Sequence, residues 1–166
     1  MMPAYNSERT IRASVESVLA QTVGDLEIVV VDNASTIPVR EVLSDVRDPR
    51  LRIVRRSRNL GTSGGRNAAL RRARAPLVSQ LDSDDEWEPD YLEYVLPCFD
   101  DPAVGLTYTN THIIGHPTGH DDYIGDPSVH PMYRFPKIAE QNPIPCPTAT
   151  IRTAALRAIG GYTRWL

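Results

Sequence analysis

The 166-residue sequence has only two cysteines, and no run of apolar residues is long enough to span a membrane. Cys98 and Cys146 match no metal-binding or redox spacing, so we expect both to be reduced. A net charge of −3 gives no reason to expect nucleic-acid binding. Arginine is abundant, but we expect it to be scattered among acids, with residues 71–74 at a solvated helix end. We therefore expect a cytoplasmic protein, at most peripheral to a membrane.

Several common catalytic patterns are also missing. The glycines of residues 59–67 lack the Gly-Lys-Ser/Thr ending of a P-loop and the Gly-x-Gly-x-x-Gly spacing of a dinucleotide site. No Ser–His–Asp order stands out in the sequence. Such triads are defined by geometry, which a sequence does not supply. His116, His120, Asp121 and Asp122 are close in sequence, but no regular pattern fixes them as ligands. We interpret them as part of a polar loop.

Helical and strand patterns alternate along the chain, which predicts an α/β fold with a mostly parallel sheet flanked by helices. The pattern fails over residues 112–147, and a segment of that length is typical of a functional loop or of a disordered segment. The strands are predicted at 26–31, 51–54, 77–81, 104–109 and 149–151, and the helices at 7–21, 39–46, 63–73, 89–99 and 153–159.

The first candidate site is the acidic group Asp82, Asp84 and Asp85, which follows an apolar run typical of a buried strand. In an alternating strand–helix chain, such a strand end lies at the edge where ligands bind. Like charges this close repel, and a hard divalent ion that brings a phosphate is the simplest offset. The alternative is an acidic turn that caps the next helix.

Two more segments have a possible role at this edge. Asp32 ends the apolar strand before Asn33, where it would accept hydrogen bonds from a base or ribose, or form an Asx turn. The glycines of residues 59–67 open a helix, whose backbone amides and Arg66 suit an anion. The same glycines may instead serve a tight turn.

Taken together and in their order along the chain, the candidate segments resemble those of the glycosyltransferases of family 2, which have the GT-A fold. Any one motif is weak, but the ordered set is specific. The resemblance implies a single GT-A-like catalytic domain over residues 1–166, and we expect that domain to be incomplete at both ends. The matching segments are 2–6, 27–35, 59–69 and 81–89, with a looser match over 151–162 that ends in Gly-Gly-Tyr.

The resemblance also implies roles for residues. It implies an inverting, metal-dependent transfer from a nucleoside-diphosphate sugar, with a UDP-sugar favoured, to an unknown glycan, lipid or protein acceptor. Asp84 would bind Mn²⁺ or Mg²⁺, and the family's catalytic base is expected beyond Leu166. Gly65 stands where the family often has Ala, which we expect to be harmless, and the first strand looks nearly absent. The residues implied in donor binding are Pro3, Tyr5, Asp32, Asn59, Arg66 and Asp82.

Two alternatives remain open. Without a base, the chain could be a non-catalytic nucleotide-sugar-binding module. A sugar-nucleotide nucleotidyltransferase of similar topology would carry a basic glycine-rich loop with lysine after its first strand. Residues 3–6, Pro-Ala-Tyr-Asn, argue against this second alternative.

Overall fold

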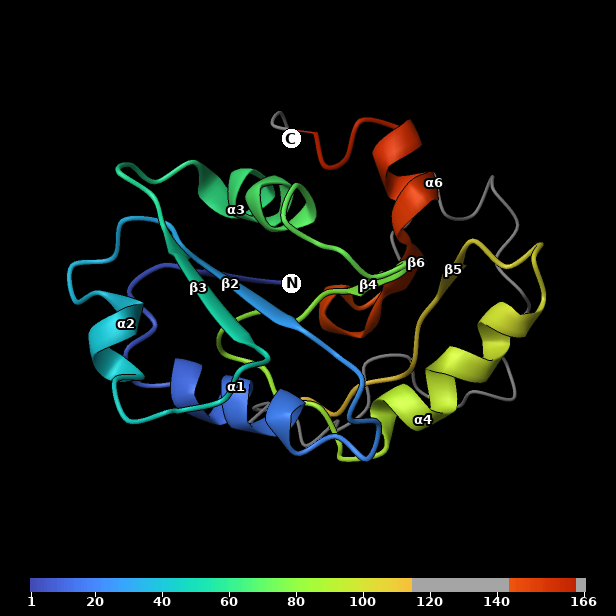
Figure 1. Cartoon of the computed structure of the whole chain (residues 1–166), viewed down its shortest axis with the longest axis horizontal. Helices are drawn as coiled ribbons and strands as arrows, with labels where there is room; N and C mark the ends of the chain where they lie inside the picture. The colour runs from blue at the N-terminus through green and yellow to red at the C-terminus, as the bar shows by residue number, and fades with distance from the viewer. Residues whose placement is uncertain (115–143, 164–166) are drawn as a thin grey trace.

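The structure is a computed structural model that describes residues 1–114 and 144–163 (Figure 1). Strands and helices alternate as predicted. The strands are β1 (Met2–Ala4), β2 (Ile28–Asp32), β3 (Leu51–Arg55), β4 (Leu77–Ser79), β5 (Leu106–Thr107) and β6 (Thr150–Arg152). The α-helices are α1 (Ile11–Leu19), α2 (Val39–Val42), α3 (Gly61–Leu70), α4 (Tyr91–Val95) and α6 (Thr153–Ala158), with 3-10 turns η1 (Leu96–Asp100) and η3 (Cys146–Thr148).

The strands form two three-stranded groups that β1 joins. The order β1-β2-β3 is parallel throughout, whereas β6 lies between β4 and β5 and is antiparallel to both. Met1 continues β1 toward β4, because its nitrogen donates to the Ser79 carbonyl at 2.7 Å and its carbonyl accepts from the Leu81 N–H at 3.2 Å. This is a parallel pattern. The mostly parallel sheet is therefore confirmed, and β6 is the exception among the described strands.

The first strand, although short, lies near the middle of the sheet. All three of its residues are buried, and it pairs with β2 at Pro3 and Val31. The sequence predicts it to be nearly absent, and three residues are in fact enough to join the two strand groups.

Helices cover both faces of β2, which explains its unbroken apolar run. Ile28 and Val30 pack with α1 in one buried cluster, and Val29 and Val31 pack with α3 residues in another. Figure 1 shows α3 on one side of the sheet and α1 and α2 on the other. Successive β2 side chains thus point to opposite faces.

Helix ends differ most from the prediction. Residues 7–21 were expected to be helical, but α1 begins after Thr10, whose side chain donates to the Ser83 carbonyl at 2.7 Å instead of capping the helix. The helix predicted over 89–99 becomes 3-10 at Leu96, next to Pro97. Proline has no N–H to donate, so the α-helical ladder cannot continue there.

Candidate functional site

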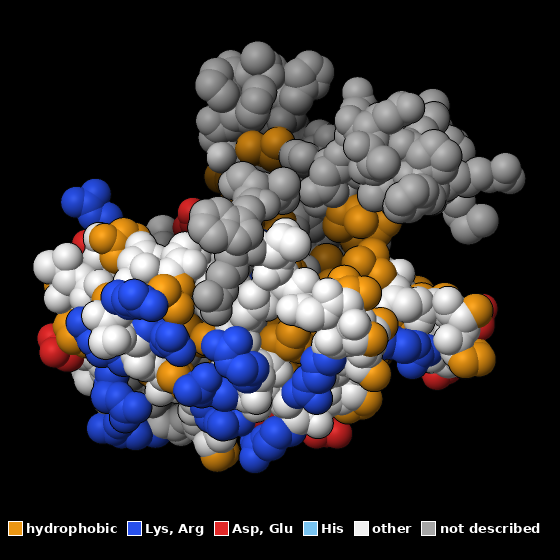
Figure 2. All heavy atoms as spheres, turned by 90° about the horizontal axis from the view of Figure 1, so that it is seen from above, with side chains coloured by type: hydrophobic (Ala, Val, Ile, Leu, Met, Phe, Trp, Pro, Cys, Tyr) orange, Lys and Arg blue, Asp and Glu red, His pale blue; other side chains and the backbone are white. Residues whose placement is uncertain are grey.

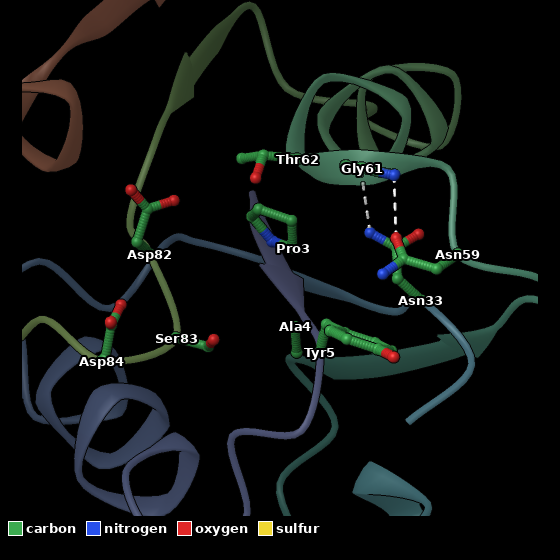
Figure 3. Close-up of a pocket in the computed structure, with 10 residues that line it drawn as sticks. All are labelled: Pro3, Ala4, Tyr5, Asn33, Asn59, Gly61, Thr62, Asp82, Ser83 and Asp84. Carbon is green, nitrogen blue, oxygen red and sulfur yellow. Dashed lines mark hydrogen bonds between the residues drawn. The ribbon is translucent and has the colours of Figure 1, made fainter. Parts of the chain in front are cut away.

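A pocket of about 350 Å³ lies at the carboxyl ends of β1, β2 and β4. Figure 3 shows Asp82 and Asp84 on one side, Asn33 and Asn59 on the other, and Tyr5 between them. This is the sheet edge at which ligands bind in α/β folds. The lining residues are Pro3, Ala4, Tyr5, Asn33, Asn59, Gly61, Thr62, Asp82, Ser83 and Asp84.

The asparagine side of the pocket is tied to the start of α3. The Asn33 Nδ2 donates to the Gly61 carbonyl at 3.1 Å, and the Gly61 N–H donates to Asn59 Oδ1 at 2.8 Å (Figure 3). Gly61 has φ of 68°, a conformation that glycine adopts at little cost. Asn33 Oδ1 is buried and accepts no hydrogen bond from the described chain. The Asn33 side chain therefore braces the start of α3 through Nδ2, and its Oδ1 is an unpaired acceptor beneath the pocket surface.

The acidic side carries more negative charge than its neighbours offset. Arg66 NH2 donates to Asp82 Oδ1 at 2.6 Å, whereas Asp84 is exposed. Burial, together with the negative charges of Asp84 and Asp82, raises the pKa of Asp85 above its ordinary value. A cation or a set of hydrogen-bond donors would relieve this repulsion.

Arg66 is clamped rather than free. Its guanidinium lies 5.8 Å from the centre of the Tyr162 ring, within cation–π range. Tyr162 is held in turn by Asn67, whose Nδ2 donates to the Tyr162 carbonyl at 2.7 Å and whose Oδ1 accepts from the Tyr162 N–H at 2.9 Å. Arg66 Nε is buried without a described partner. The Gly-Gly-Tyr segment thus orients the arginine that orients Asp82.

Asp32 lies outside the pocket lining, and only 1% of it is exposed. Its Oδ1 accepts from the Ser35 N–H at 2.8 Å, and its Oδ2 accepts from the Val39 N–H at 3.2 Å and Arg55 NH1 at 2.7 Å. Burial alone would raise the pKa of Asp32, but these donors hold it below its ordinary value. Its predicted contact with a base or ribose stays a prediction, and in this structure Asp32 orders the loop after β2.

Gly65 lies within α3 and not in a turn. A Cβ added there would lie 2.6 Å from Asn33 Nδ2 and 2.8 Å from Pro3 Cβ. The alanine that the family often has at this position would therefore crowd two pocket residues in this chain.

A divalent ion fits this site as part of a complex rather than alone. Among residues 1–114 and 144–163, no group of three or more His, Cys, Asp or Glu side chains could hold a metal. Mg²⁺ is usually held by one or two carboxylates together with phosphates and water. Asp84 is exposed at the pocket beside a group of carboxylates with few donors, and its role as a metal ligand stays a prediction.

Five of the seven predicted site residues line the pocket: Pro3, Tyr5, Asn59, Asp82 and Asp84. Arg66 does not line the pocket but donates a hydrogen bond to Asp82, and Asp32 is buried. Asn33 and Tyr162 were missed, although both stand in segments that the resemblance covers. Asp121, Asp122, Asp126 and Glu140, which are acidic residues of the predicted loop, lie outside the described residues, as do His116 and His120.

The fold is the GT-A fold of glycosyltransferases. TarS of S. aureus, in a structure of its residues 1–349, superposes with a TM-score of 0.79 at 24% identity, over 97% of this chain and 48% of that one. The mannosyltransferase PcManGT of Pyrobaculum calidifontis, in complex with GDP-Man and Mn²⁺, superposes with a TM-score of 0.71 at 22% identity, over 98% of this chain and 46% of that one.

The chain belongs to glycosyl transferase family 2, whose family model matches residues 1–159. It is 35% identical over 114 residues to the succinoglycan biosynthesis protein ExoO of Rhizobium meliloti, covering 69% of this chain and 33% of the relative. It is 34% identical over 116 residues to the Escherichia coli UDP-Glc:alpha-D-GlcNAc-diphosphoundecaprenol beta-1,3-glucosyltransferase WfgD, covering 70% and 46%. The chain thus matches between a third and a half of the length of these relatives.

Proposed function

We propose that this chain forms the donor-binding part of a glycosyltransferase that takes its sugar from a nucleoside-diphosphate sugar, with a UDP-sugar favoured. The observation that carries the proposal is the pocket itself. It gathers Tyr5, Asn59 and Asp82 from segments far apart in the sequence, at the carboxyl edge of the sheet. Membership of family 2 and the UDP-GlcNAc complex of TarS, which shares the fold, support the choice of ligand.

The residues divide the donor between them. Tyr5, which is exposed at the pocket, would contact the nucleoside, and Asn33 would hold the start of α3 beside it. Asp82, held by Arg66, would face the ribose or the metal shell. Asp84 would ligate Mn²⁺ or Mg²⁺, and such an ion screens a diphosphate and stabilises it as a leaving group.

The acceptor and the base are less closely defined. By family resemblance the transfer is inverting, with a carboxylate that takes the proton of the acceptor hydroxyl. That carboxylate is expected beyond Leu166. The WfgD name specifies a lipid-diphosphate-linked sugar as acceptor, and we extend this acceptor class to the present chain.

Thermal unfolding with ligands tests the donor site. UDP with Mn²⁺ should raise the Tm more than UDP alone, because ligands stabilise the folded state by mass action. Asp84→Asn should remove the metal-dependent increment. Glu86→Gln is the matched control, since Glu86 is an exposed acid two residues away that does not line the pocket.

The proposal fails if UDP leaves the Tm unchanged with and without the ion. The assignment of Asp84 fails separately if Asp84→Asn keeps the full increment, or if Glu86→Gln loses it as well. A non-catalytic binding module would give the same binding results without turnover. Rapid transfer from UDP-sugars to a panel of acceptors would exclude the binding module and would require a base within residues 1–166, because general-base help is worth about 10²–10⁴-fold in rate.

A further inference from the structure

Charge is sorted along this chain, contrary to the expectation that the arginines are mixed with acids. Nine arginines lie between Arg50 and Arg74, and no Asp or Glu occurs from residue 49 to residue 81. Nine acids then lie between Asp82 and Asp101, and no Lys or Arg occurs from residue 75 to residue 133. The net charge of −3 hides two blocks of opposite sign.

The arginine block comprises β3, α3 and their flanks, and the acidic block comprises the loop after β4, then α4 and η1. The loop after β4 lines the donor pocket, whereas α4 and η1 lie on the other side of the sheet from α3. Figure 1 shows α3 above the sheet and α4 below it. Figure 2 looks onto the α3 side, where arginine side chains gather and Asp and Glu lie at the margins. We use the name arginine face for the arginines that contact or flank α3. They are Arg52, Arg72 and Arg74 with their contacts at the end of α3, Arg71 and Arg157 between α3 and α6, and Arg58 just before α3.

Internal contacts hold part of this face in position without neutralising it. Glu27 pairs with both Arg52 and Arg74, each at 3.0 Å. Arg72 donates to the Ala68 carbonyl at 3.0 Å, and Arg157 donates to the Ala73 carbonyl at 2.7 Å. Carbonyls at a helix end carry only a partial negative charge. Glu27 therefore offsets the charge of two of the six arginines, and the other four keep theirs.

The exposed members of the face include Arg58 and Arg71. Arg71 and Arg157 also line a hollow of about 650 Å³ between α3 and α6. Arg58 lies at the other end, next to Asn59 of the donor pocket. The arginine face therefore runs from this hollow to the rim of the pocket.

We propose that the arginine face docks on an anionic phospholipid surface. Guanidinium groups pair with phosphate through several N–H donors at once, and basic groups near an anionic membrane each add attraction. Residues 50–74 contain no aromatic residue, and Tyr162, which lines the hollow, already packs on Arg66. Single-stranded nucleic acid is instead bound by several aromatic stacking platforms together with arginines. The acids of α4 and η1, on the far side, would be repelled by the membrane and so orient the protein.

Docking in this orientation brings the asparagine side of the pocket rim, next to Arg58, to the lipid surface, and leaves Asp82 and Asp84 on the opposite side of the pocket. A lipid-linked acceptor would then meet the donor there, which rests on the proposed function. The docking itself needs no sugar transfer, so its test is independent of turnover.

Vesicle flotation tests the proposal. Vesicles of phosphatidylcholine alone are compared with vesicles containing phosphatidylglycerol, at low salt and at high salt. The protein should float with the anionic vesicles only, and high salt should release it. Arg58→Gln/Arg71→Gln should weaken binding about thirty-fold, because each basic residue near the surface contributes about 1 kcal/mol.

The matched control is Arg9→Gln/Arg47→Gln, which removes the same charge from exposed positions beside α1 and α2. It should bind within about two-fold of the unchanged protein, and a thermal melt checks that both variants fold. An equal loss in both variants, or no binding to anionic vesicles, overturns the proposal. So does displacement by millimolar glycerol phosphate, which would indicate a site for a free phosphate. Equal or tighter binding to RNA of the same phosphate concentration would assign the face to nucleic acid instead.

Discussion

The strands β2 and β4 both lead into carboxylates at the same edge of the sheet, yet these carboxylates have opposite surroundings. Asp32 at the end of β2 is buried, and three donors of its own chain hold its pKa low. Beyond β4, Asp84 is exposed, and the pKa of Asp85 is raised by burial and by its acidic neighbours. From the sequence alone, the carboxylates at both strand ends are predicted to contact a ligand.

The difference separates stability from binding. A carboxylate whose oxygens are all satisfied internally stabilises the fold and has little left to offer a ligand. A carboxylate group with too few donors costs stability, and that cost is relieved when a cation arrives. Asp32 therefore stabilises the loop after β2, whereas the carboxylates after β4 keep the capacity to bind a ligand.

Asp32→Asn should give the largest effect. It should lower the free energy of unfolding by about 3 kcal/mol, because it removes a buried charge that accepts three hydrogen bonds. Asp84→Asn should change it by less than about 0.5 kcal/mol, since Asp84 is exposed. Urea denaturation measures both values. Equal losses would remove the distinction between the two strand ends, and a loss of UDP affinity of roughly ten-fold in folded Asp32→Asn would support a direct contact with the nucleoside.

Gly65→Ala should have the next largest effect on stability, because the added methyl group would displace Asn33 and Pro3, which both line the pocket. The added Cβ would crowd Asn33 and Pro3, and overpacking of this kind costs about 1–3 kcal/mol. UDP affinity, measured by calorimetry, should fall as well. Gly24→Ala is the control, because a Cβ there meets nothing within 4 Å. A Gly65→Ala protein with unchanged Tm and affinity would mean that this region yields easily.

Tyr162→Leu should have a smaller effect, confined to the acidic side. Without the ring, Arg66 loses a cation–π contact worth about 0.5–1 kcal/mol, and Asp82 is held less firmly. UDP affinity should fall about two- to five-fold. Tyr162→Phe keeps the ring and removes a buried hydroxyl that has no described partner, so its affinity should match the unchanged protein. If Phe weakens binding as much as Leu does, the hydroxyl and not the ring is the group that matters.

The smallest expected effect is a difference in pH dependence. The lowered pKa of Asp32 contributes stability that is present above its unfolded value of 3.8 and is lost as the pH falls through its folded value. The raised pKa of Asp85 has the opposite sign, because its contribution is present below 3.8 and is lost as the pH rises through its folded value. Asp85→Asn should therefore be slightly more stable than the unchanged protein at pH 7, and the difference should vanish at pH 3. Tm values across that range would show it.

The fold was largely predictable because β2 is apolar on both faces and the strand–helix alternation is regular. The carboxyl-edge site followed from the ends of β2 and β4, and five of the seven predicted residues line the pocket. The helix ends were less accurate, because Thr10 bonds to the Ser83 carbonyl and Pro97 interrupts α4, which are contacts and steric limits that periodicity does not record.

Three features required the structure. One of the hydrogen bonds that Asp32 accepts comes from Arg55 on the neighbouring strand. The cation–π contact that holds Arg66 comes from Tyr162, which is distant in sequence. Gly65 looked permissive until Asn33 and Pro3 were placed against it. The charge blocks, in contrast, were present in the sequence and were obscured by the small net charge.

The position of β6 has a consequence for how the chain matures. The β1-β2-β3 group is complete once residue 55 has been made, whereas β4 and β5 have no strand between them until residues 150–152 arrive. Leu77 pairs with Arg152, a long loop to close, and non-local pairing of this kind slows folding. On the ribosome, one half of the sheet would assemble early and the other would wait with open strand edges, which are the sites at which chains stick to one another.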